Sequence, residues 1–363
     1  MEPIDDRNVE DMNLTTRQDN SLNPSVRADN TGVLILLIRS RKEAQLWFSN
    51  ILSIAMFLFV FGIVTNGVIC FVMLPGKRYK KNTSNFYILH LSVTDLVSRL
   101  LISPIVMYSV VTASKIESIQ CKFLYLFSNT FASGTFVSLA AIATDRYQNI
   151  VYPMRALKTK KTTPLHQVFL VWSYVILVSI PSVVSVQSIA IYEIPEAQGM
   201  DCENCTDMEI CDIPQNAMGQ VSTTSYFVFA FLAPLTLIFV LYSKIAFVLH
   251  QRSSNGIMHK VAARSKSKAV RMLVLAVFGY ALSLGPASLF VMLRSYGTFN
   301  NSSFHILFVV SWMVQILSLT SSVGNPIIYA YYNGDFRNEV LKQFCRSSTK
   351  CSAPSTSVQN PSR

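Results

Sequence analysis

Seven long stretches of the chain carry almost no charge. Six of them contain no Asp, Glu, Lys or Arg, and the stretch 82–114 is interrupted only by Asp95 and Arg99. A helix needs about 20 apolar residues to cross the hydrocarbon core of a bilayer, where the backbone must satisfy its own hydrogen bonds. A soluble helical bundle would instead show polar stripes at the helical period. The sequence therefore predicts seven membrane-spanning helices. They cover residues 44–76, 82–114, 123–144, 162–192, 213–243, 272–293 and 297–334.

Lysine and arginine are distributed unevenly among the connecting segments. The connections after the second, fourth and sixth stretches hold only Lys115, Lys122 and Arg294, whereas the other connections and the C-terminal tail are strongly basic. Cytoplasmic loops of membrane proteins keep the excess of Lys and Arg. We therefore expect a multi-pass plasma-membrane protein with its N-terminus outside and its C-terminus inside. The net charge of +11 then reflects orientation and contact with membrane lipid, and nucleic acid is excluded as a partner.

The predicted fold is an all-α membrane protein, a seven-transmembrane helix bundle with a short amphipathic eighth helix. In that last helix Phe336, Val340 and Leu341 share one face while Arg337 and Lys342 line the rest, which suits a helix lying on the inner leaflet. The chain then has four parts. They are an extracellular disordered N-terminal tail (1–43), the seven-helix domain (44–333), the membrane-surface helix (334–346) and a cytoplasmic Ser/Thr-rich tail (347–363).

Four cysteines lie on the predicted outside. Cys121 stands at the outer edge of the third stretch, and Cys202, Cys205 and Cys211 lie in the loop before the fifth. Disulfides form in this oxidising compartment. We expect Cys121 to pair with one of the loop cysteines. Cys211 is preferred because it lies nearest the fifth stretch, with Cys202 then pairing to Cys205.

Two kinds of covalent modification are also predicted. Glycosylation sequons on outside segments start at Asn13, Asn204, Asn300 and Asn301. A further match at Asn82 falls on an inside loop and is interpreted as chance. On the inside, Cys345 and Cys351 follow the last stretch closely and are candidates for palmitoylation, with free thiols as the alternative.

Several motifs resemble one known family. The third stretch ends in Asp145-Arg146-Tyr147, and the seventh ends in NPIIY, from Asn325 to Tyr329. Matching residues in the other stretches are Asn66, Asp95, Trp172, Pro234, Tyr242 and Pro286. Either motif alone is weak, but both stand at the right ends of the right stretches. Over roughly residues 45–346 the chain resembles a rhodopsin-like (class A) G-protein-coupled receptor of the peptide-receptor-like branch.

The resemblance implies roles for residues at the inner end. Arg146 would meet the G protein once the sixth helix swings outward, and Asp145 would hold it in the resting state. An arginine at the membrane edge reaches water at small cost and can also turn inward. Pro286 and Pro326 interrupt helix hydrogen bonds and give places to bend. The remaining residues of this coupling group are Tyr147, Tyr242, Asn325 and Tyr329.

The resemblance also implies a sodium ion in the polar core, at Asp95. A carboxylate at mid-span costs about 2.5–3.5 kcal/mol on insertion scales, so it must pair, protonate or hold a cation. The residues implied around the ion are Asn66, Thr135, Ser322 and Asn325. Arg99 lies four residues on, hence on the same helix face. It either pairs with Asp95 and displaces the sodium, or points into the ligand pocket. The pocket is preferred because Arg99 lies one turn nearer the outside.

One position departs from the family pattern. The family usually has tryptophan two residues before the proline of the sixth span, and Leu284 stands there. That tryptophan acts as a packing switch below the ligand. Its absence predicts atypical coupling, and it raises the alternative of a constitutively active orphan receptor. Tyr280, one turn below, is the candidate to carry part of the role.

The ligand class follows from the charges near the outer end. The third stretch lacks the acid that amine receptors use, and the seventh lacks the lysine that binds retinal. The loop 193–212 holds seven acidic residues and no Lys or Arg, which steers basic ligands. Deeper residues are basic or polar. The predicted pocket consists of Arg99, Lys122, Ser128, Arg294 and Gln315. This polarity favours a peptide with basic residues near the mouth and an acidic or amidated end inside, and a small acid or lipid is the alternative.

The implied partners are an extracellular peptide, a heterotrimeric G protein, membrane lipid, and arrestin and receptor kinases acting at the Ser/Thr-rich tail. No cofactor is expected apart from the sodium ion. Enzyme motifs such as HExxH, GxSxG or a phosphate loop do not occur, so an enzyme is not expected. A transporter is the rival from a different class. It is disfavoured because no internal repeat is found and only Asp95 and Arg99 are charged within the stretches.

Overall fold

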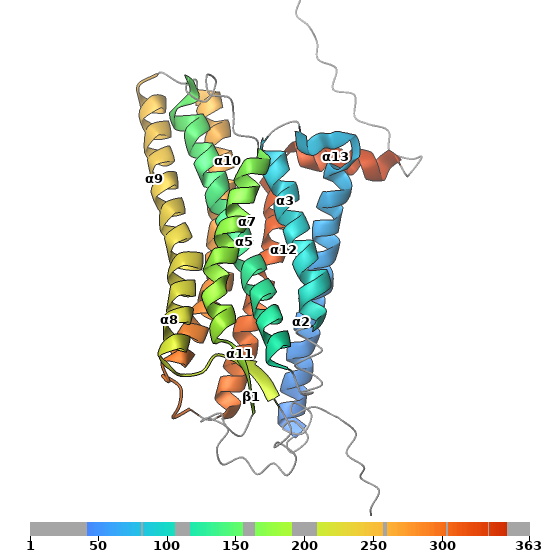
Figure 1. Cartoon of the computed structure of the whole chain (residues 1–363). Helices are drawn as coiled ribbons and strands as arrows, with labels where there is room; N and C mark the ends of the chain where they lie inside the picture. The colour runs from blue at the N-terminus through green and yellow to red at the C-terminus, as the bar shows by residue number, and fades with distance from the viewer. Residues whose placement is uncertain are drawn as a thin grey trace, which may run out of the picture.

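The computed structural model describes residues 42–80, 83–105, 117–154, 164–190, 209–256, 260–302, 304–332 and 334–346. Over these residues the chain forms a bundle of long helices that run side by side (Figure 1). Within the described residues, six helical segments are long and apolar enough to cross a membrane. They are Ser49–Met73, Asn85–Ile105, Ser118–Val151, Leu165–Ser185, Ala217–Ser254 and Lys266–Ser295. The first six predicted stretches are therefore confirmed as helices of sufficient length and apolar character to span a membrane.

The helices build the bundle around a central member, α5. In chain order they are α2 (Lys42–Met73), η2 (Pro75–Lys80), α3 (Thr83–Val97), η3 (Ser98–Ile102), α5 (Ser118–Val151), α7 (Pro164–Ser185), α8 (Ala217–Tyr226), η7 (Phe227–Leu232), α9 (Ala233–Ser254), α10 (Lys260–Ser295), α11 (Phe304–Leu319), α12 (Ser321–Tyr332) and α13 (Gly334–Arg346). Helix α5 packs against α3, α7, α9 and α10. The residues of α5 are accordingly the most buried of the six spans.

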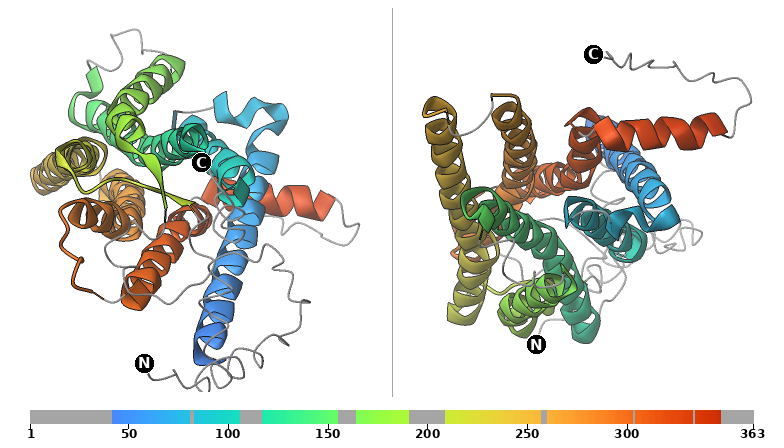
Figure 2. Two further views of the ribbon diagram at one scale, coloured as in Figure 1. Left: turned by 60° about the horizontal axis from the view of Figure 1, so that its bottom comes forward. Right: turned by 90° about the horizontal axis from the view of Figure 1, so that it is seen from above.

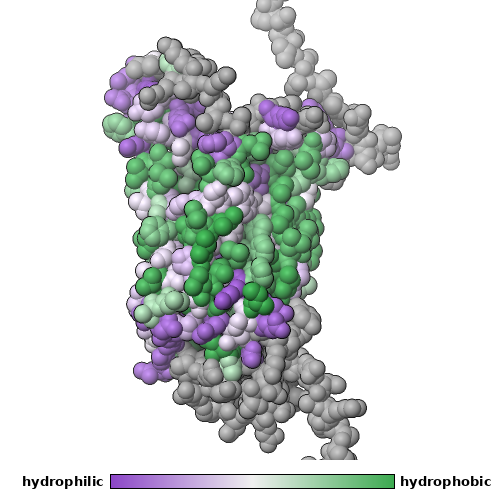
Figure 3. All heavy atoms as spheres, in the orientation of Figure 1, coloured by the Kyte–Doolittle hydropathy of each residue, from purple (hydrophilic) through white to green (hydrophobic). Residues whose placement is uncertain are grey.

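The surface of the bundle is the reverse of a soluble protein's. Apolar side chains cover the middle of the visible face and polar ones gather at its two ends (Figure 3). Phe57, Phe169 and Phe239 are among the large apolar side chains that point outward. Small polar side chains such as Ser138 and Ser179 are instead buried between helices, where their hydroxyls bond to carbonyls four residues back. This distribution matches a lipid-facing exterior.

Two wide helical turns occur just before prolines. In η3 the N–H of Ser103 donates to the carbonyl of Ser98, five residues back, and Pro104 follows. In η7 the N–H of Ala233 donates to the carbonyl of Val228 in the same manner, and the next residue is again a proline. A proline ring clashes with the carbonyl four residues before it, and a π turn moves that carbonyl away. Each wide turn inserts one residue into its helix.

The stretch 297–334, predicted as one span, forms two helices. Helix α11 has 16 residues and α12 has 12, and they meet at Thr320. In a continuous α-helix the N–H of Val323 would donate to Leu319, but here it donates to the carbonyl of Thr320 at 3.1 Å. The Thr320 hydroxyl also donates to the carbonyl of Leu317 at 2.6 Å. The prediction of a single helix is wrong because these contacts tighten the chain at Thr320.

A short hairpin lies across one end of the bundle, and the all-α prediction missed it. Strands β1 (Gln187–Ala190) and β2 (Glu209–Asp212) pair antiparallel, with Ser188 opposite Cys211. Figure 2 shows the hairpin over the end of the helices from which α5 begins. The predicted fourth stretch ran to residue 192, whereas α7 ends at Ser185. The chain after Ser185 instead pairs with β2, from Gln187 opposite Asp212 to Ala190 opposite Glu209.

Helix α13 lies across the bundle axis at the opposite end (Figure 1). It contacts α2 and α12. Phe336 is buried against the bundle core, while Leu341 and Lys342 are exposed. The helix therefore buries part of its apolar face and leaves the rest open.

Candidate functional site

A disulfide fixes the hairpin to the third span. Cys121, in the first turn of α5, is bonded to Cys211 of β2, as predicted. Cys121 is fully buried and forms a small core with Val186 and Ile213, against which Tyr125 packs. The bond therefore holds β2 over the end of the helical bundle. Cys202 and Cys205 lie outside the described residues.

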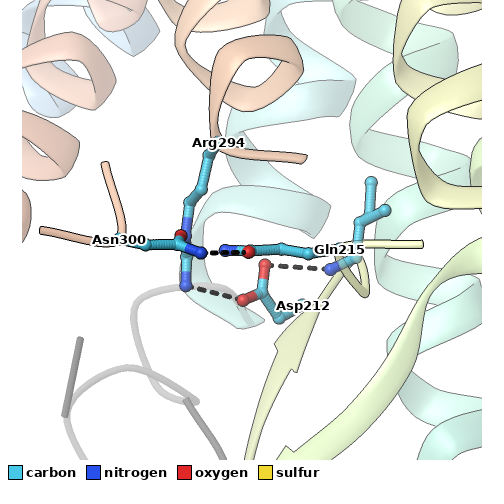
Figure 4. A network of polar contacts seen from close by, with 5 residues as sticks. Asp212, Gln215, Arg294 and Asn300 are labelled. Atoms are coloured by element: carbon cyan, nitrogen blue, oxygen red, sulfur yellow. Dashed lines mark hydrogen bonds and ion pairs between the residues drawn. The ribbon is translucent and has the colours of Figure 1, made fainter. Parts of the chain in front are cut away.

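An ion pair connects this hairpin to the sixth span. Arg294 Nη2 lies 2.6 Å from Asp212 Oδ2, and Asp212 directly follows the disulfide-bonded Cys211. The other oxygen, Asp212 Oδ1, accepts the backbone N–H of Ile213 at 2.9 Å. Figure 4 shows four polar side chains converging here: Asp212 from β2, Gln215 from the segment after it, Arg294 from the last turn of α10, and Asn300 from the turn that follows α10. Arg294 was predicted as a ligand-pocket residue, and the structure shows it half-buried and in this ion pair.

A neutral contact continues the network beyond the ion pair. The Asn300 amide donates to Gln215 Oε1 at 2.9 Å. Asn300 was predicted as a glycosylation site, and its side-chain nitrogen, the atom that carries a glycan, is engaged here. Asn301, the second overlapping sequon, is exposed. Asn13 and Asn204 lie outside the described part of the chain.

The other predicted pocket residues are spread along two helices. Lys122 and Ser128 are half-buried on α5, and Gln315 is exposed on α11.

A hydrogen bond that could not be predicted from the sequence joins α8 to α10. The Thr223 and Ser295 hydroxyls lie 2.7 Å apart, both buried. These two residues join the fifth and sixth spans at the hairpin end of the bundle.

The polar core surrounds Asp95. Thr135 donates to Asp95 Oδ1 at 3.5 Å, and the Tyr280 hydroxyl donates to Oδ2 at 3.4 Å. Asn66 donates to the carbonyl of Ser322 at 3.0 Å, which joins α2 to α12. The predicted core residues Asn66, Asp95, Thr135 and Ser322 are all buried, and the side chain of Asn325 lies outside the described set. Tyr280 brings the sixth span into this core.

Arg99 points neither into the outer pocket nor at Asp95. Its side chain is 2% exposed. Nη1 donates to the carbonyl of Leu58 in α2 at 3.2 Å, and Nη2 donates to the carbonyl of Leu319 in α11 at 2.6 Å. The preferred prediction, a pocket-facing arginine, is therefore wrong. The same-face argument fails because Arg99 lies in the π turn η3, where the spacing of an α-helix does not hold.

Aromatic rings occupy the region beside Leu284. Phe136 of α5 stacks on Phe231 of η7 with ring centroids 5.4 Å apart. A Cβ on Gly285 would lie 2.7 Å from the ring of Phe231, so this ring packs directly on α10. Leu284 is half-buried against the same core. These stacked phenylalanines lie next to the position where the family usually has tryptophan.

The end of the bundle opposite the hairpin holds several of the predicted coupling residues. Arg146 Nε lies 3.9 Å from Asp145 Oδ2, and the two side chains are 23% and 12% exposed. Tyr242 and Tyr329 are buried, and among the described residues their hydroxyls have no hydrogen-bond partner. Unpaired buried hydroxyls are costly, so these two are candidates for new partners in another conformation.

Arg252, also at the end opposite the hairpin, was not predicted as a site residue from the sequence. From α9 it donates to the carbonyls of Ile150 and Val151 at 2.6 and 2.8 Å. These are the last carbonyls of α5, where a cation is favoured. Arg252 therefore joins the third and fifth spans at this end of the bundle.

Comparisons with known proteins show which family the sequence resembles. The model of the family described as "7 transmembrane receptor (rhodopsin family)" matches residues 65–329. Neuropeptide FF receptor 2 of Mus musculus is 28% identical, over 82% of this chain and 74% of its own length. Neuropeptide FF receptor 1 of Homo sapiens is 29% identical, over 77% and 66%. Galanin receptor type 1 of Homo sapiens is 26% identical, over 81% and 82%.

Proposed function

The chain belongs to the rhodopsin family of seven-transmembrane receptors, and on that premise we propose that it is a G-protein-coupled receptor for a secreted peptide. The observation that carries the ligand proposal is the acidic hairpin, which the Cys121–Cys211 disulfide holds across one end of the bundle. Two of the similar receptors are named for a neuropeptide. This family is not one of enzymes or transporters.

The proposed topology places the hairpin outside the cell and α13 inside, at the plasma membrane. A disulfide supports an oxidising compartment for the hairpin end. Basic side chains at the opposite end, including Lys80, Lys266 and Lys268, support a cytoplasmic location there. Helices α11 and α12 then form the seventh crossing in two pieces. Their combined length is sufficient for a bilayer, and α13 lies at the membrane surface.

The proposed ligand has basic groups that face the hairpin. Glu209 and Asp212 both lie on β2, and Asp212 is the carboxylate that holds Arg294. A basic ligand residue can share Asp212, and an acidic or amidated end can then reach the released Arg294 or the half-buried Lys122. A small acid or lipid would contact only the cationic side chains of Arg294 and Lys122 and would not need Asp212. These charges therefore separate the two ligand classes.

Removal of the negative charge of Asp212 tests the peptide proposal. Cell membranes containing the receptor are assayed for nucleotide exchange on a panel of G proteins, with a library of secreted peptides and a set of small acids. We expect one peptide class to stimulate exchange, and Asp212→Asn to lower its potency about tenfold, equivalent to about 1.4 kcal/mol. Asn300→Ala, in the same network but neutral, is the matched control and should leave potency unchanged.

Three other outcomes would contradict the peptide proposal. Activation by small acids alone, with potency that depends on Arg294 but not on Asp212, would favour the alternative ligand class. High exchange without ligand would identify a constitutively active receptor, the alternative suggested by Leu284. No stimulated nucleotide exchange, from a receptor that reaches the cell surface, would contradict the peptide ligand but not the family assignment.

The inner end is proposed to contact the G protein, arrestin and membrane lipid. Tyr242 and Tyr329 would gain hydrogen-bond partners near Arg146 when the sixth helix moves outward. A pocket of about 550 Å³ is lined by Lys268, Arg271, Tyr331, Tyr332 and Arg337. Three cations around one pocket at the membrane surface favour an anionic lipid headgroup. The proposed phosphorylation sites and Cys351 lie outside the described residues, and the side chain of Cys345 is not described.

A further inference from the structure

Arg99 is the largest fully buried side chain among the described residues. Its two terminal nitrogens donate to the carbonyls of Leu58 and Leu319, so one side chain on the second span joins the first and the seventh. A buried guanidinium is expensive unless its charge is balanced. Arg99 therefore needs an opposite charge nearby.

Asp95 supplies the opposite charge. It is buried one turn before Arg99 on the same helix, and the two charges interact electrostatically although no ion pair joins them directly. Together the two residues are neutral. A sodium ion placed at Asp95 would leave a net positive charge in a low-dielectric core that already contains a guanidinium. The residues around Asp95 therefore do not fit a resident sodium ion.

The break in the seventh span supplies a second reason for Arg99 to remain in place. Leu319 is the last residue of α11, and its carbonyl is released because the N–H of Val323 donates to Thr320 instead. The C-terminal end of a helix carries partial negative charge, which a cation stabilises. Arg99 thus satisfies a backbone carbonyl that the break would leave unpaired.

Gly62 provides the space for the guanidinium. A Cβ at this position would lie 2.5 Å from Arg99 Cζ and 2.6 Å from its Nε. Those distances are far below van der Waals contact, so any larger residue would displace the guanidinium. Gly67, on the same helix, faces open space: a Cβ added there would have no atom within 4 Å, so this position tolerates a side chain.

From these contacts we propose that Arg99 is a tethered cation that takes the place of a sodium ion beside Asp95 and fastens the outer half of the seventh span to the first. The receptor's resting conformation is consequently insensitive to sodium. This proposal concerns the resting protein and does not depend on the ligand class proposed above.

Thermal unfolding of the purified full-length receptor tests the proposal without a ligand. The unfolding temperature is measured in sodium chloride and in choline chloride at equal ionic strength. We expect the same unfolding temperature in both salts. Arg99→Gln keeps a polar side chain but removes its charge, so this variant should become more stable in sodium than in choline. Asp95→Asn added to Arg99→Gln should abolish that difference.

Glycine substitutions test the position of the guanidinium independently. Gly62→Ala should lower the unfolding temperature, because it displaces Arg99 from the carbonyls of Leu58 and Leu319. The unfolding temperature of this variant should then be higher in sodium chloride than in choline chloride. Gly67→Ala is the matched control and should behave like the unmodified receptor. Sodium-specific stabilisation of the unmodified receptor that disappears in Asp95→Asn would overturn the proposal. Identical behaviour of the two glycine variants would refute the contact with Gly62.

Discussion

Replacement of Arg146 by alanine is expected to abolish stimulated nucleotide exchange while surface expression stays near normal. Arg146 lies at the inner end with its Nε 3.9 Å from Asp145, a long and partly exposed contact that contributes little to stability. The loss should therefore fall on coupling rather than on folding. Nucleotide exchange by receptor-containing membranes and cell-surface labelling measure the two effects separately.

Replacement of two other cationic residues by alanine serves as the control for Arg146→Ala. Lys80→Ala removes an exposed cation of η2 and should leave both exchange and expression unchanged. Arg252→Ala removes the cation bonded to Ile150 and Val151, so it should lower expression or stability as well. Full signalling by Arg146→Ala would rule out the proposed role of this arginine.

Removal of the disulfide is expected to have the second large effect. The bond closes a 90-residue separation, and a loop of that size corresponds to roughly 4–5 kcal/mol in the chain-entropy model. Cys211→Ser also frees β2, which carries Asp212 and so its ion pair with Arg294. We expect strongly reduced surface expression, measured by labelling intact cells, and loss of ligand response in the molecules that reach the surface.

The double replacement of Cys121 and Cys211 is the control for this prediction. Both single variants remove the same bond, so the double variant should lose no more than either single variant. A double variant much worse than the singles would show that each cysteine contributes by packing as well. Normal expression and response in Cys211→Ser would contradict a structural role for the hairpin's attachment.

The spans and the disulfide were predictable because they depend on simple properties of the sequence. Long apolar stretches with no charge, or in the second stretch with only Asp95 and Arg99, located the first six candidate membrane helices. Cys211 was preferred as the partner of Cys121 from its place along the chain, and the structure confirms it. The hairpin between Gln187 and Asp212 was missed because its strands of four residues each adjoin apolar spans.

The position of Arg99 was not predictable from helical periodicity. That periodicity assumes 3.6 residues per turn, and η3 departs from it just before Pro104. The carbonyl of Leu319 can accept a hydrogen bond from Arg99 because α11 ends at that residue. The apolar composition of the stretch does not reveal where this helix ends. Backbone acceptors carry no side-chain signature, so neither carbonyl that Arg99 contacts could be inferred from residue types.

The two wide turns change how positions in this chain correspond to those in other receptors. Each residue of an α-helix turns the chain by about 100°, so one inserted residue rotates everything beyond it by that angle. Residues after Ile102 on the second span and residues before Phe227 on the fifth lie beyond such an insertion, on the outer side. A gap-free alignment with a receptor whose helices are regular would pair those outer residues with neighbours that face other directions. Ligand contacts transferred to this chain from such a receptor should therefore be shifted by one position along both outer segments.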